Sequence, residues 1–220
     1  MNEKKDYPVG AKIMDIITET NDVKTFIIDK EISAEPGQFV MAWIPGIDEK
    51  PFTITRAGKS LAITAKKKGK ATSAMHIMKK GDILGIRGPY GNGTFDLENK
   101  KKIILVGGGY GTLGLALLLE EAIKNKIKVD AIIGANTKED LVFVERFKKS
   151  GANITITTDD GSAGKKALAT AVLEEKLKTQ KYDAICTCGP EIMMHHILKL
   201  GLTYGIEVQA SLERWMKCGF

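Results

Sequence analysis

The sequence predicts an N-terminal antiparallel β-barrel over residues 1–99, followed by a doubly wound parallel α/β sheet over residues 100–210. Two observations predict this division. In the first hundred residues, short stretches rich in Ile, Val and Thr alternate with Gly and Pro turns, which is typical of a small barrel or sandwich. Beyond residue 102, apolar stretches alternate with helical ones, which implies parallel strands joined by crossovers. The charged run 98–102 between the two patterns is the expected linker.

Each expected element follows from its local pattern. In the first domain the expected strands are 11–19, 23–29, 38–44, 52–55, 60–65 and 83–87, with one helix over 72–78. In the second domain the expected strands are 102–106, 128–133, 153–157, 184–187 and 207–210. The helices expected between them are 112–124, 138–149, 166–177 and 191–200.

Composition excludes several classes of protein. The chain has 220 residues, 43% of them hydrophobic and 27% charged, which is an ordinary globular mixture rather than a disordered one. The net charge of +6 is spread over short lysine clusters beside turns, which are typical of solvated loops. The more specific alternative is that these lysine clusters attract anionic ligands or an acidic partner. The sequence contains no basic stripe interleaved with aromatic residues, the pattern that would indicate nucleic-acid binding.

The three cysteines, Cys186, Cys188 and Cys218, do not form a disulfide framework, and they favour a reducing, cytoplasmic setting. No apolar signal core follows the charged start of the chain. The most apolar run, 103–119, is interrupted by glycines, so no membrane span is expected.

A glycine-rich run, Gly107-Gly108-Gly109-Tyr110-Gly111, lies between an apolar strand and an apolar helix. Glycines at this point let the backbone approach a pyrophosphate, and the helix start supplies free N–H groups. The competing interpretation is a tight turn that needs small residues only for packing. Asp130 lies too early in its strand to reach a ribose, so the usual acidic partner of this fingerprint is missing.

Three further motifs are ambiguous when taken singly. Lys50-Pro51-Phe52-Thr53 reads as an ordinary strand start. In the run 69–73, Thr72 or Ser73 is a candidate cap for the short helix, and such a helix start also suits a phosphate. Cys188-Gly189-Pro190 follows a strand at the edge where doubly wound folds bind ligands, although a lone Cys is more often a small buried hydrophobe.

In their order along the chain, these motifs resemble the ferredoxin–NADP reductase superfamily over nearly the whole length. Within it, the chain looks most like the electron-transfer subunits of NAD-linked dihydroorotate dehydrogenases. The residues that carry the resemblance are 50–53, 69–73, 88–93, 107–111, 159–162, 188–190 and the ending 211–219.

The resemblance implies a role for each matching residue. Lys50, at the first position of the motif that continues with Pro51, would face the FAD pyrophosphate, Phe52 the flavin ring and Thr53 the flavin N5 edge. Lys in place of the family's Arg keeps the charge but loses the bidentate fork. By the same analogy, the remaining FAD contacts are Thr64, Ala65 and Lys66 along the cofactor and Ala71 and Thr72 at its phosphates.

The nicotinamide nucleotide would be framed by Gly107, Gly108, Gly109 and Gly111 together with Cys188, Gly189 and Pro190. Cys188 would lie near the nicotinamide without acting as a nucleophile. The choice between NAD and NADP stays open, because residues 136–138 could accept a 2′-phosphate although no Arg is present there.

The resemblance implies that residues 211–220 begin an iron–sulfur segment that is cut short, in which Cys218 would be the first of four thiolates that hold a [2Fe–2S] centre. The sequence stops two residues later, so either the chain is a fragment, which is the expectation, or the protein lacks the cluster.

The resemblance therefore implies an NAD(P)H-dependent flavoprotein of pyrimidine biosynthesis. It would pass electrons from NADH through FAD and a [2Fe–2S] centre to a dihydroorotate dehydrogenase catalytic subunit, in a hetero-oligomer expected to be a heterotetramer. One alternative is the flavin subunit of a soluble hydrogenase or of a ferredoxin:NADP oxidoreductase. An alternative of another class is a non-catalytic nucleotide-binding module.

Overall fold

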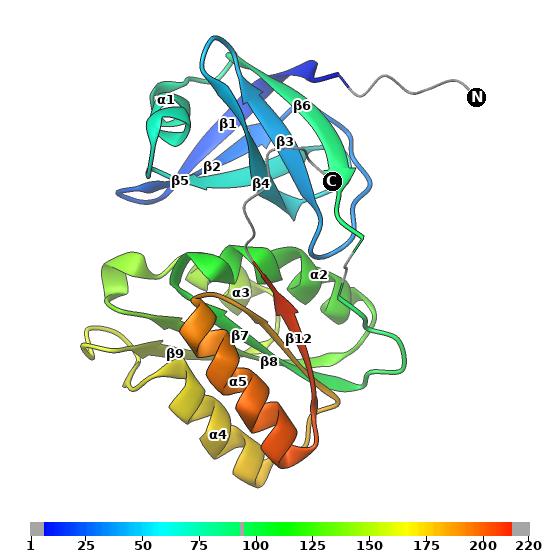
Figure 1. Ribbon diagram of the computed structural model, residues 1–220, viewed down its shortest axis with the longest axis vertical. Helices are drawn as coiled ribbons and strands as arrows, with labels where there is room; N and C mark the ends of the chain where they lie inside the picture. Colours follow the sequence, from blue (N-terminus) through cyan, green and yellow to red (C-terminus); the bar gives the residue numbers. More distant parts are fainter. Residues whose placement is uncertain (1–6, 93–94, 213–220) are drawn as a thin grey trace. The chain divides into compact units, whose positions relative to one another are not determined.

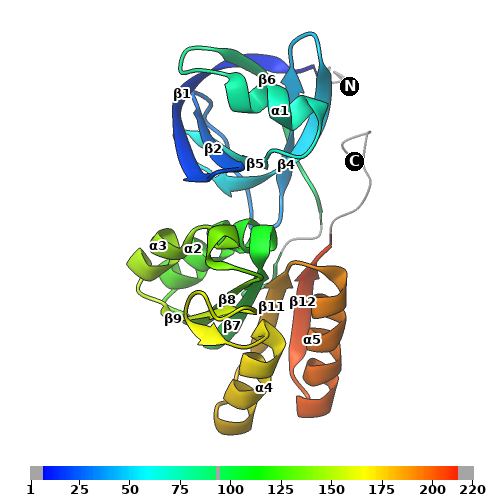
Figure 2. The ribbon, with the colours of Figure 1, turned by 90° about the vertical axis from the view of Figure 1, so that its left-hand side faces the viewer.

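The computed structural model describes residues 7–92 and 95–212, which form two compact units. Residues 7–92 are called the barrel unit and residues 95–212 the sheet unit. The barrel unit is a closed antiparallel barrel in the strand order β1-β2-β5-β4-β3-β6, and Figure 2 shows the strands as a ring (Figures 1 and 2). Its elements are β1 (Val9–Thr20), β2 (Val23–Ile28), β3 (Phe39–Ile44), β4 (Asp48–Arg56), β5 (Leu61–Lys66), α1 (Lys70–Ile77) and β6 (Ile83–Tyr90).

Alternation along the strands explains why these residues close into a barrel. In β1, Ala11 and Ile13 are buried while Lys12 and Met14 are exposed, so one side of the strand faces the core. Strands β2 and β5 are buried along nearly their whole length, so they add many large apolar side chains to the packed core. The largest fully buried ones in this unit are Ile13, Phe26, Ile28, Met41, Ile54, Leu61, Ile63, Met75, Leu84 and Ile86.

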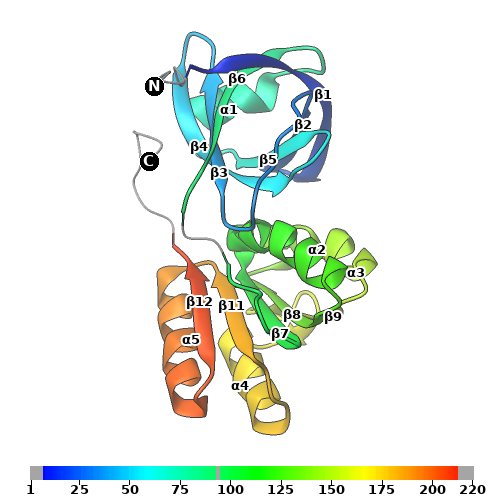
Figure 3. The same ribbon diagram turned by 90° about the vertical axis from the view of Figure 1, so that its right-hand side faces the viewer.

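The sheet unit is a six-stranded sheet in the order β10-β9-β8-β7-β11-β12, and all of its registered pairs are parallel (Figure 3). Its strands are β7 (Lys102–Gly108), β8 (Lys128–Ala135), β9 (Asn153–Thr158), β10 (Lys165–Lys166), β11 (Ala184–Cys188) and β12 (Glu207–Ser211). Its helices are η1 (Gly109–Leu115), α2 (Ala116–Lys124), η2 (Lys138–Asp140), α3 (Val144–Lys149), α4 (Ala169–Thr179) and α5 (Glu191–Tyr204). The chain order reverses between β7 and β11, and this barrel followed by a doubly wound sheet confirms the predicted fold class.

Helices cover both faces of this sheet, which explains why its central strands are apolar throughout. On one face Ile104, Val106 and Ile185 pack against Val172 and Leu173 of α4 and against α5. The helices α2 and α3 cover the opposite face (Figure 2). None of the helices in the described residues is long and apolar enough to cross a membrane.

Several expected helix limits are corrected. Helix α1 begins at Lys70, and Gly69 is its N-cap rather than Thr72 or Ser73. The run expected as one helix over 112–124 starts as the 3-10 segment η1, because it follows the strand through a glycine turn. The run 138–149 is split into η2 and α3, since Phe143 takes a left-handed φ of 59° and is buried. Helix α4 starts at Ala169, because Lys165–Lys166 pairs with β9 as a short strand.

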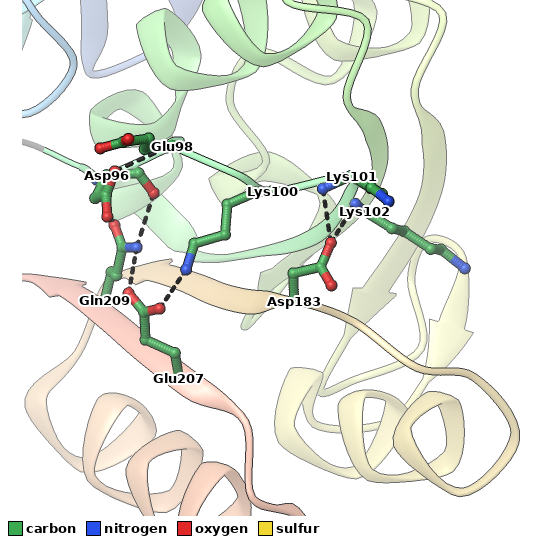
Figure 4. Close-up of polar contacts among 8 residues, drawn as sticks. All are labelled: Asp96, Glu98, Lys100, Lys101, Lys102, Asp183, Glu207 and Gln209. Atoms are coloured by element: carbon green, nitrogen blue, oxygen red, sulfur yellow. Dashed lines mark hydrogen bonds and ion pairs between the residues drawn. The ribbon is translucent and has the colours of Figure 1, made fainter.

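The expected linker is held on the sheet unit (Figure 4). The Asp96 backbone forms two hydrogen bonds with the Gln209 side chain, at 2.8 and 2.9 Å, and Lys100 forms an ion pair with Glu207. Two consecutive backbone N–H groups, those of Lys101 and Lys102, donate to the Asp183 carboxylate at 2.7 and 2.8 Å. Residues 95–101 therefore lie against β12 and the start of β11, and the last residue of the expected linker already belongs to β7.

Candidate functional site

The motif residues of the barrel unit meet where β4 separates from β5. The registered pairs between these two strands are Ile54 with Ile63 and Arg56 with Ala62, within the part of the chain that the structure describes. Before Ile54, β4 is registered with β3 alone, from Asp48 to Thr53. The backbone edges of residues 50–53 and 64–66 on either side of this separation therefore have no registered partner strand. Such edges carry hydrogen-bonding groups that suit a polar ligand.

The four residues of the first motif differ in what they present. The Lys50 ammonium lies 2.6 Å from the Asp48 carboxylate, and both side chains are well exposed. Phe52 is buried in the barrel, whereas Thr53 is exposed on the outer face. Pro51, which donates no backbone hydrogen bond, lies between Lys50 and Phe52 on the half-buried part of β4. The motif therefore offers one cation and one hydroxyl to solvent.

Across the separation, the residues expected along FAD are held by internal contacts. Thr64 is buried, and its hydroxyl lies 2.8 Å from that of Thr25. The Ala65 carbonyl accepts a hydrogen bond of 2.9 Å from His76 Nε2 of α1, and Lys66 forms an ion pair of 3.2 Å with Asp22. The Thr64 hydroxyl and the Ala65 carbonyl are therefore already used in contacts within the barrel unit.

Helix α1 starts beside this separation, because the chain leaves β5 and turns at Gly69. Ala71 is buried, and the Thr72 hydroxyl accepts hydrogen bonds from the backbone N–H groups of Lys68 and Gly69, at 2.9 and 3.1 Å. The first turn of this helix contains no acidic side chain. A basic, glycine-preceded helix start of this kind suits an anionic group such as a pyrophosphate.

In the sheet unit, the structure brings the two nucleotide motifs together. Strands β7 and β11 are neighbours, with Gly107 registered to Cys188, so both loops leave the same carboxyl edge at the point where the strand order reverses. This is the place where doubly wound sheets bind ligands. The loops touch: a Cβ added at Gly111 would lie 2.5 Å from Gly189 Cα, and one added at Gly108 would lie 2.7 Å from Pro190 Cδ.

The glycines of this loop have two different roles. Gly107, Gly108 and Gly111 are required for packing, since an added Cβ would clash with Thr112, Pro190 and Gly189 respectively. Gly109 has a left-handed φ of 51°, and an added Cβ there would meet nothing within 4 Å. Packing therefore explains three of these four glycines, and Gly109 is the one that faces open space.

Cysteine chemistry at this edge is restrained by burial. Cys188 is 8% exposed, and its Sγ would lie 3.0 Å from a Cβ added at Gly114, so the thiol packs under the loop. Cys186 is buried within β11, and burial raises the pKa of its thiol to about 12. Neither is in a disulfide. A high thiol pKa means little thiolate at neutral pH, which makes Cys186 a poor nucleophile.

Asp130 lies where the sequence places it, away from the nucleotide edge. It is buried, accepts a hydrogen bond of 2.5 Å from the Tyr182 hydroxyl and one of 3.2 Å from Asn153. This carboxylate is used in the sheet unit's own packing.

The loop after β9 was not among the expected site residues, although its motif helped to carry the resemblance. The backbone N–H groups of Asp159 and Asp160 donate to the carbonyls of Ala135 and Asn136, at 3.1 and 3.2 Å. Hydrogen bonds from Ser162 lower the pKa of Asp160. The loop therefore brings carboxylates to the end of β8, which lacks an acidic residue of its own.

No ligand set for an iron–sulfur centre is present in the described residues, where no group of three or more His, Cys, Asp or Glu side chains could hold a metal ion. Cys218, the expected metal ligand, lies outside them. The described residues therefore supply no ligand set for such a centre.

Known proteins resemble this chain in sequence and in fold. No family model matches it. Two curated relatives, from Methanocaldococcus jannaschii and Methanothermobacter thermautotrophicus, are named probable dihydroorotate dehydrogenase B (NAD(+)), electron transfer subunit. The first is 44% identical over 97% of this chain and 81% of its own length, and the second 39% identical over 98% and 81%.

Among solved structures, an NADH-dependent reduced ferredoxin–NADP oxidoreductase has a TM-score of 0.85 and 29% identity, over 95% of this chain and 80% of its own. A cytochrome P450 reductase from Amycolatopsis has a TM-score of 0.80 with 18% identity, over 94% and 69%, and shows the fold alone.

The barrel with its separated strands, followed by a doubly wound sheet whose two loops meet at the reversal point, defines the ferredoxin–NADP reductase class of flavin-dependent oxidoreductases. Within that class, the chain belongs to the family of dihydroorotate dehydrogenase B electron transfer subunits.

Proposed function

We propose that this chain binds FAD on the barrel unit and NADH on the sheet unit, and delivers the electrons to a dihydroorotate dehydrogenase catalytic subunit in pyrimidine biosynthesis. The observation that carries the proposal is the placement of the motifs. Lys50, Thr53 and Thr72 lie around one separation in the barrel wall, and the loops after β7 and β11 meet at one sheet edge.

The residues around the separation fit FAD. Backbone edges without a registered partner strand can hydrogen-bond the flavin, and the start of α1 suits the pyrophosphate. Bound FAD accepts a pair of electrons from NADH and can release them one at a time. Lys50 would neutralise phosphate charge in exchange for its ion pair with Asp48, while Thr53 would hold the reacting edge of the flavin through its hydroxyl.

The residues of the sheet unit would hold and orient the nucleotide. Gly109 leaves open space for its pyrophosphate, and Gly189 and Pro190 would form the opposite wall. Cys188 would support that wall by packing rather than by chemistry. For the adenosine end, the loop carrying Asp159 and Asp160 favours NADH, because ionised carboxylates repel a 2′-phosphate.

The family supports the choice of partner, and the cysteines support the location. Its members are named as subunits, so the proposed partner is the catalytic subunit, in a hetero-oligomer of the heterotetramer type. A cytoplasmic location is supported by Cys186 and Cys188, which are buried thiols rather than a disulfide. The described residues supply no ligands for the [2Fe–2S] centre, so the proposal assigns them no part in holding it.

Co-purification tests the partner. Expressed with a tag from its own gene in its native cell, the protein is expected to retain the catalytic subunit, and the complex is expected to reduce NAD⁺ when given dihydroorotate. A ferredoxin:NADP oxidoreductase subunit is the second candidate, favoured by the 29% identity to such a structure. Retention of a second flavoprotein that reacts with ferredoxin and not with dihydroorotate would establish it instead.

A further inference from the structure

An ion pair crosses the outer face of the barrel over strand β3. Strand β3 lies between β4 and β6, with Trp43 registered to Glu49 on one side and Met41 registered to Arg87 on the other (Figure 1). The Arg87 guanidinium donates to both Glu49 carboxylate oxygens, Nε to Oε1 at 2.8 Å and Nη2 to Oε2 at 2.7 Å. The two strands that flank β3 are thus joined by a bidentate contact, called here the Arg87–Glu49 clamp.

The clamp is better built than an ordinary surface ion pair. The side chains are 13% and 22% exposed, and Met41, on the strand between them, is fully buried. Arg87 Nη1 also donates to the Tyr90 hydroxyl at 3.1 Å, and the guanidinium lies 5.5 Å from the Tyr90 ring centroid. The hydrogen bonds to Glu49 raise the pKa of Arg87 further above its usual range. Planar, two-pronged contacts of this kind fix geometry as well as charge.

The clamp reaches both ends of the segment that carries the first motif. Glu49 directly precedes Lys50, so it fixes the start of the segment. At the other end, the Tyr90 ring lies 5.8 Å from that of Phe39, and Phe39 is registered to Thr53. Because residues 48–53 of β4 are registered with β3 alone, the segment lacks the second neighbour that holds an ordinary barrel strand.

We propose that Arg87, acting through Glu49 and Tyr90, is a positioning residue for the flavin: it holds residues 50–53 in the conformation that receives FAD. This inference rests on the proposed function. A segment with one free edge must be pre-organised by other contacts, since each residue ordered on binding lowers the affinity. The clamp supplies that order before the ligand arrives.

A purely stabilising ion pair is the competing explanation, and the chain contains a matched control. In the sheet unit, Arg146 pairs with Glu120 at 2.7 Å and lies 5.0 Å from the Phe143 ring centroid, so it repeats the cation, carboxylate and aromatic ring. Substitutions there remove a comparable contact without touching the barrel unit.

The test compares Arg87→Lys and Glu49→Gln with Arg146→Lys and Glu120→Gln in the full chain. Three quantities are measured: the dissociation constant of FAD, the visible circular dichroism of FAD at saturation, and the melting temperature without FAD. Both clamp variants are expected to weaken FAD binding about tenfold and to change the dichroism of bound FAD. The variant that carries both Arg87→Lys and Glu49→Gln is expected to bind FAD no more weakly than the single variant with the lower affinity, because both changes break the same contact. The two control variants are expected to leave both flavin measurements unchanged.

Clamp variants that lower the melting temperature but bind FAD with unchanged affinity and dichroism would overturn the inference. If Arg87→Lys fails to fold, Glu49→Gln decides alone, because it keeps the shape of the side chain. A wild-type protein that does not bind FAD would instead refute the proposed function, and the inference with it.

Discussion

Gly109 differs from its neighbours in the glycine loop, because an added side chain there would enter open space rather than protein. Gly109→Val is therefore expected to block NADH, lowering its affinity at least about tenfold, or 1.4 kcal/mol, while FAD binding on the barrel unit is unchanged. Titration of NADH, followed by the quenching of protein fluorescence, measures the first effect.

Backbone strain is controlled by Gly205→Val. Gly205 also has a left-handed φ, 64°, and open space, but it follows α5 at the far end from the nucleotide edge. If both variants lose NADH binding equally, backbone strain is the cause. If Gly109→Val loses FAD, the assignment of the two ligands to the two units is wrong.

Thr53 presents the exposed hydroxyl of the first motif. Thr53→Ala is expected to slow flavin reduction by NADH about tenfold or more while leaving the FAD dissociation constant nearly unchanged, since the hydroxyl would contact the reacting edge rather than the phosphates. Rapid mixing without oxygen measures the rate. Thr53→Ser keeps the hydroxyl and is expected to restore it; an unchanged rate in Thr53→Ala would remove Thr53 from that role.

At the level of elements, the sequence identified the order of strands and helices because buried strands and amphipathic helices leave local patterns. It did not identify the separation of β4 from β5, since which strand pairs with which depends on contacts distant in sequence. The split of the run 138–149 was missed for a similar reason: burial of Phe143 in a left-handed conformation overrides its helical pattern.

The motifs of the site were predictable from the sequence, but the contacts between distant residues were not. The sequence located the glycine loop and the Cys188 motif separately, and the strand order then explains why they meet. Burial of Thr64 was not predictable, because only the register shows that its hydroxyl faces Thr25. The Arg87–Glu49 clamp joins two residues that are 38 positions apart in the sequence, so it left no local signal.

The attachment of residues 95–102 to the sheet unit gives a pH-dependent prediction. Hydrogen bonds from the backbone N–H groups of Lys102 and Lys101 lower the pKa of Asp183. A lowered folded-state pKa means that its contribution is complete above the unfolded value, near 4, and is lost as the pH falls through the folded value. Asp183 is exposed, so solvent screening limits this contribution. Asp183→Asn is therefore expected to cost less than about 1 kcal/mol at pH 7, and its stability is expected to fall less than that of the wild type below about pH 4.

Urea unfolding at several pH values measures this difference. Glu98→Gln is the matched control, because it removes an exposed carboxylate from the same segment. A wild type and an Asp183→Asn variant that lose stability in parallel as the pH falls would contradict the assignment.

At the level of the whole molecule, the 220-residue chain is expected to bind FAD and to hold no iron–sulfur cluster. A [2Fe–2S] centre needs four protein ligands, and the sequence contains three cysteines, of which Cys186 and Cys188 are buried in the sheet. Iron analysis and electron paramagnetic resonance of the dithionite-reduced protein measure this. A stoichiometric reduced-cluster signal from these 220 residues would overturn the expectation.

Reduction of bound flavin by NADH tests the central claim most directly. The purified chain is saturated with FAD, freed of excess cofactor and titrated with NADH in the absence of oxygen, while the visible flavin absorption is recorded. The account predicts a yellow protein whose absorption is bleached by one equivalent of NADH per bound FAD. A protein that stays colourless after FAD is added, or that keeps its flavin oxidised in excess NADH, would contradict it.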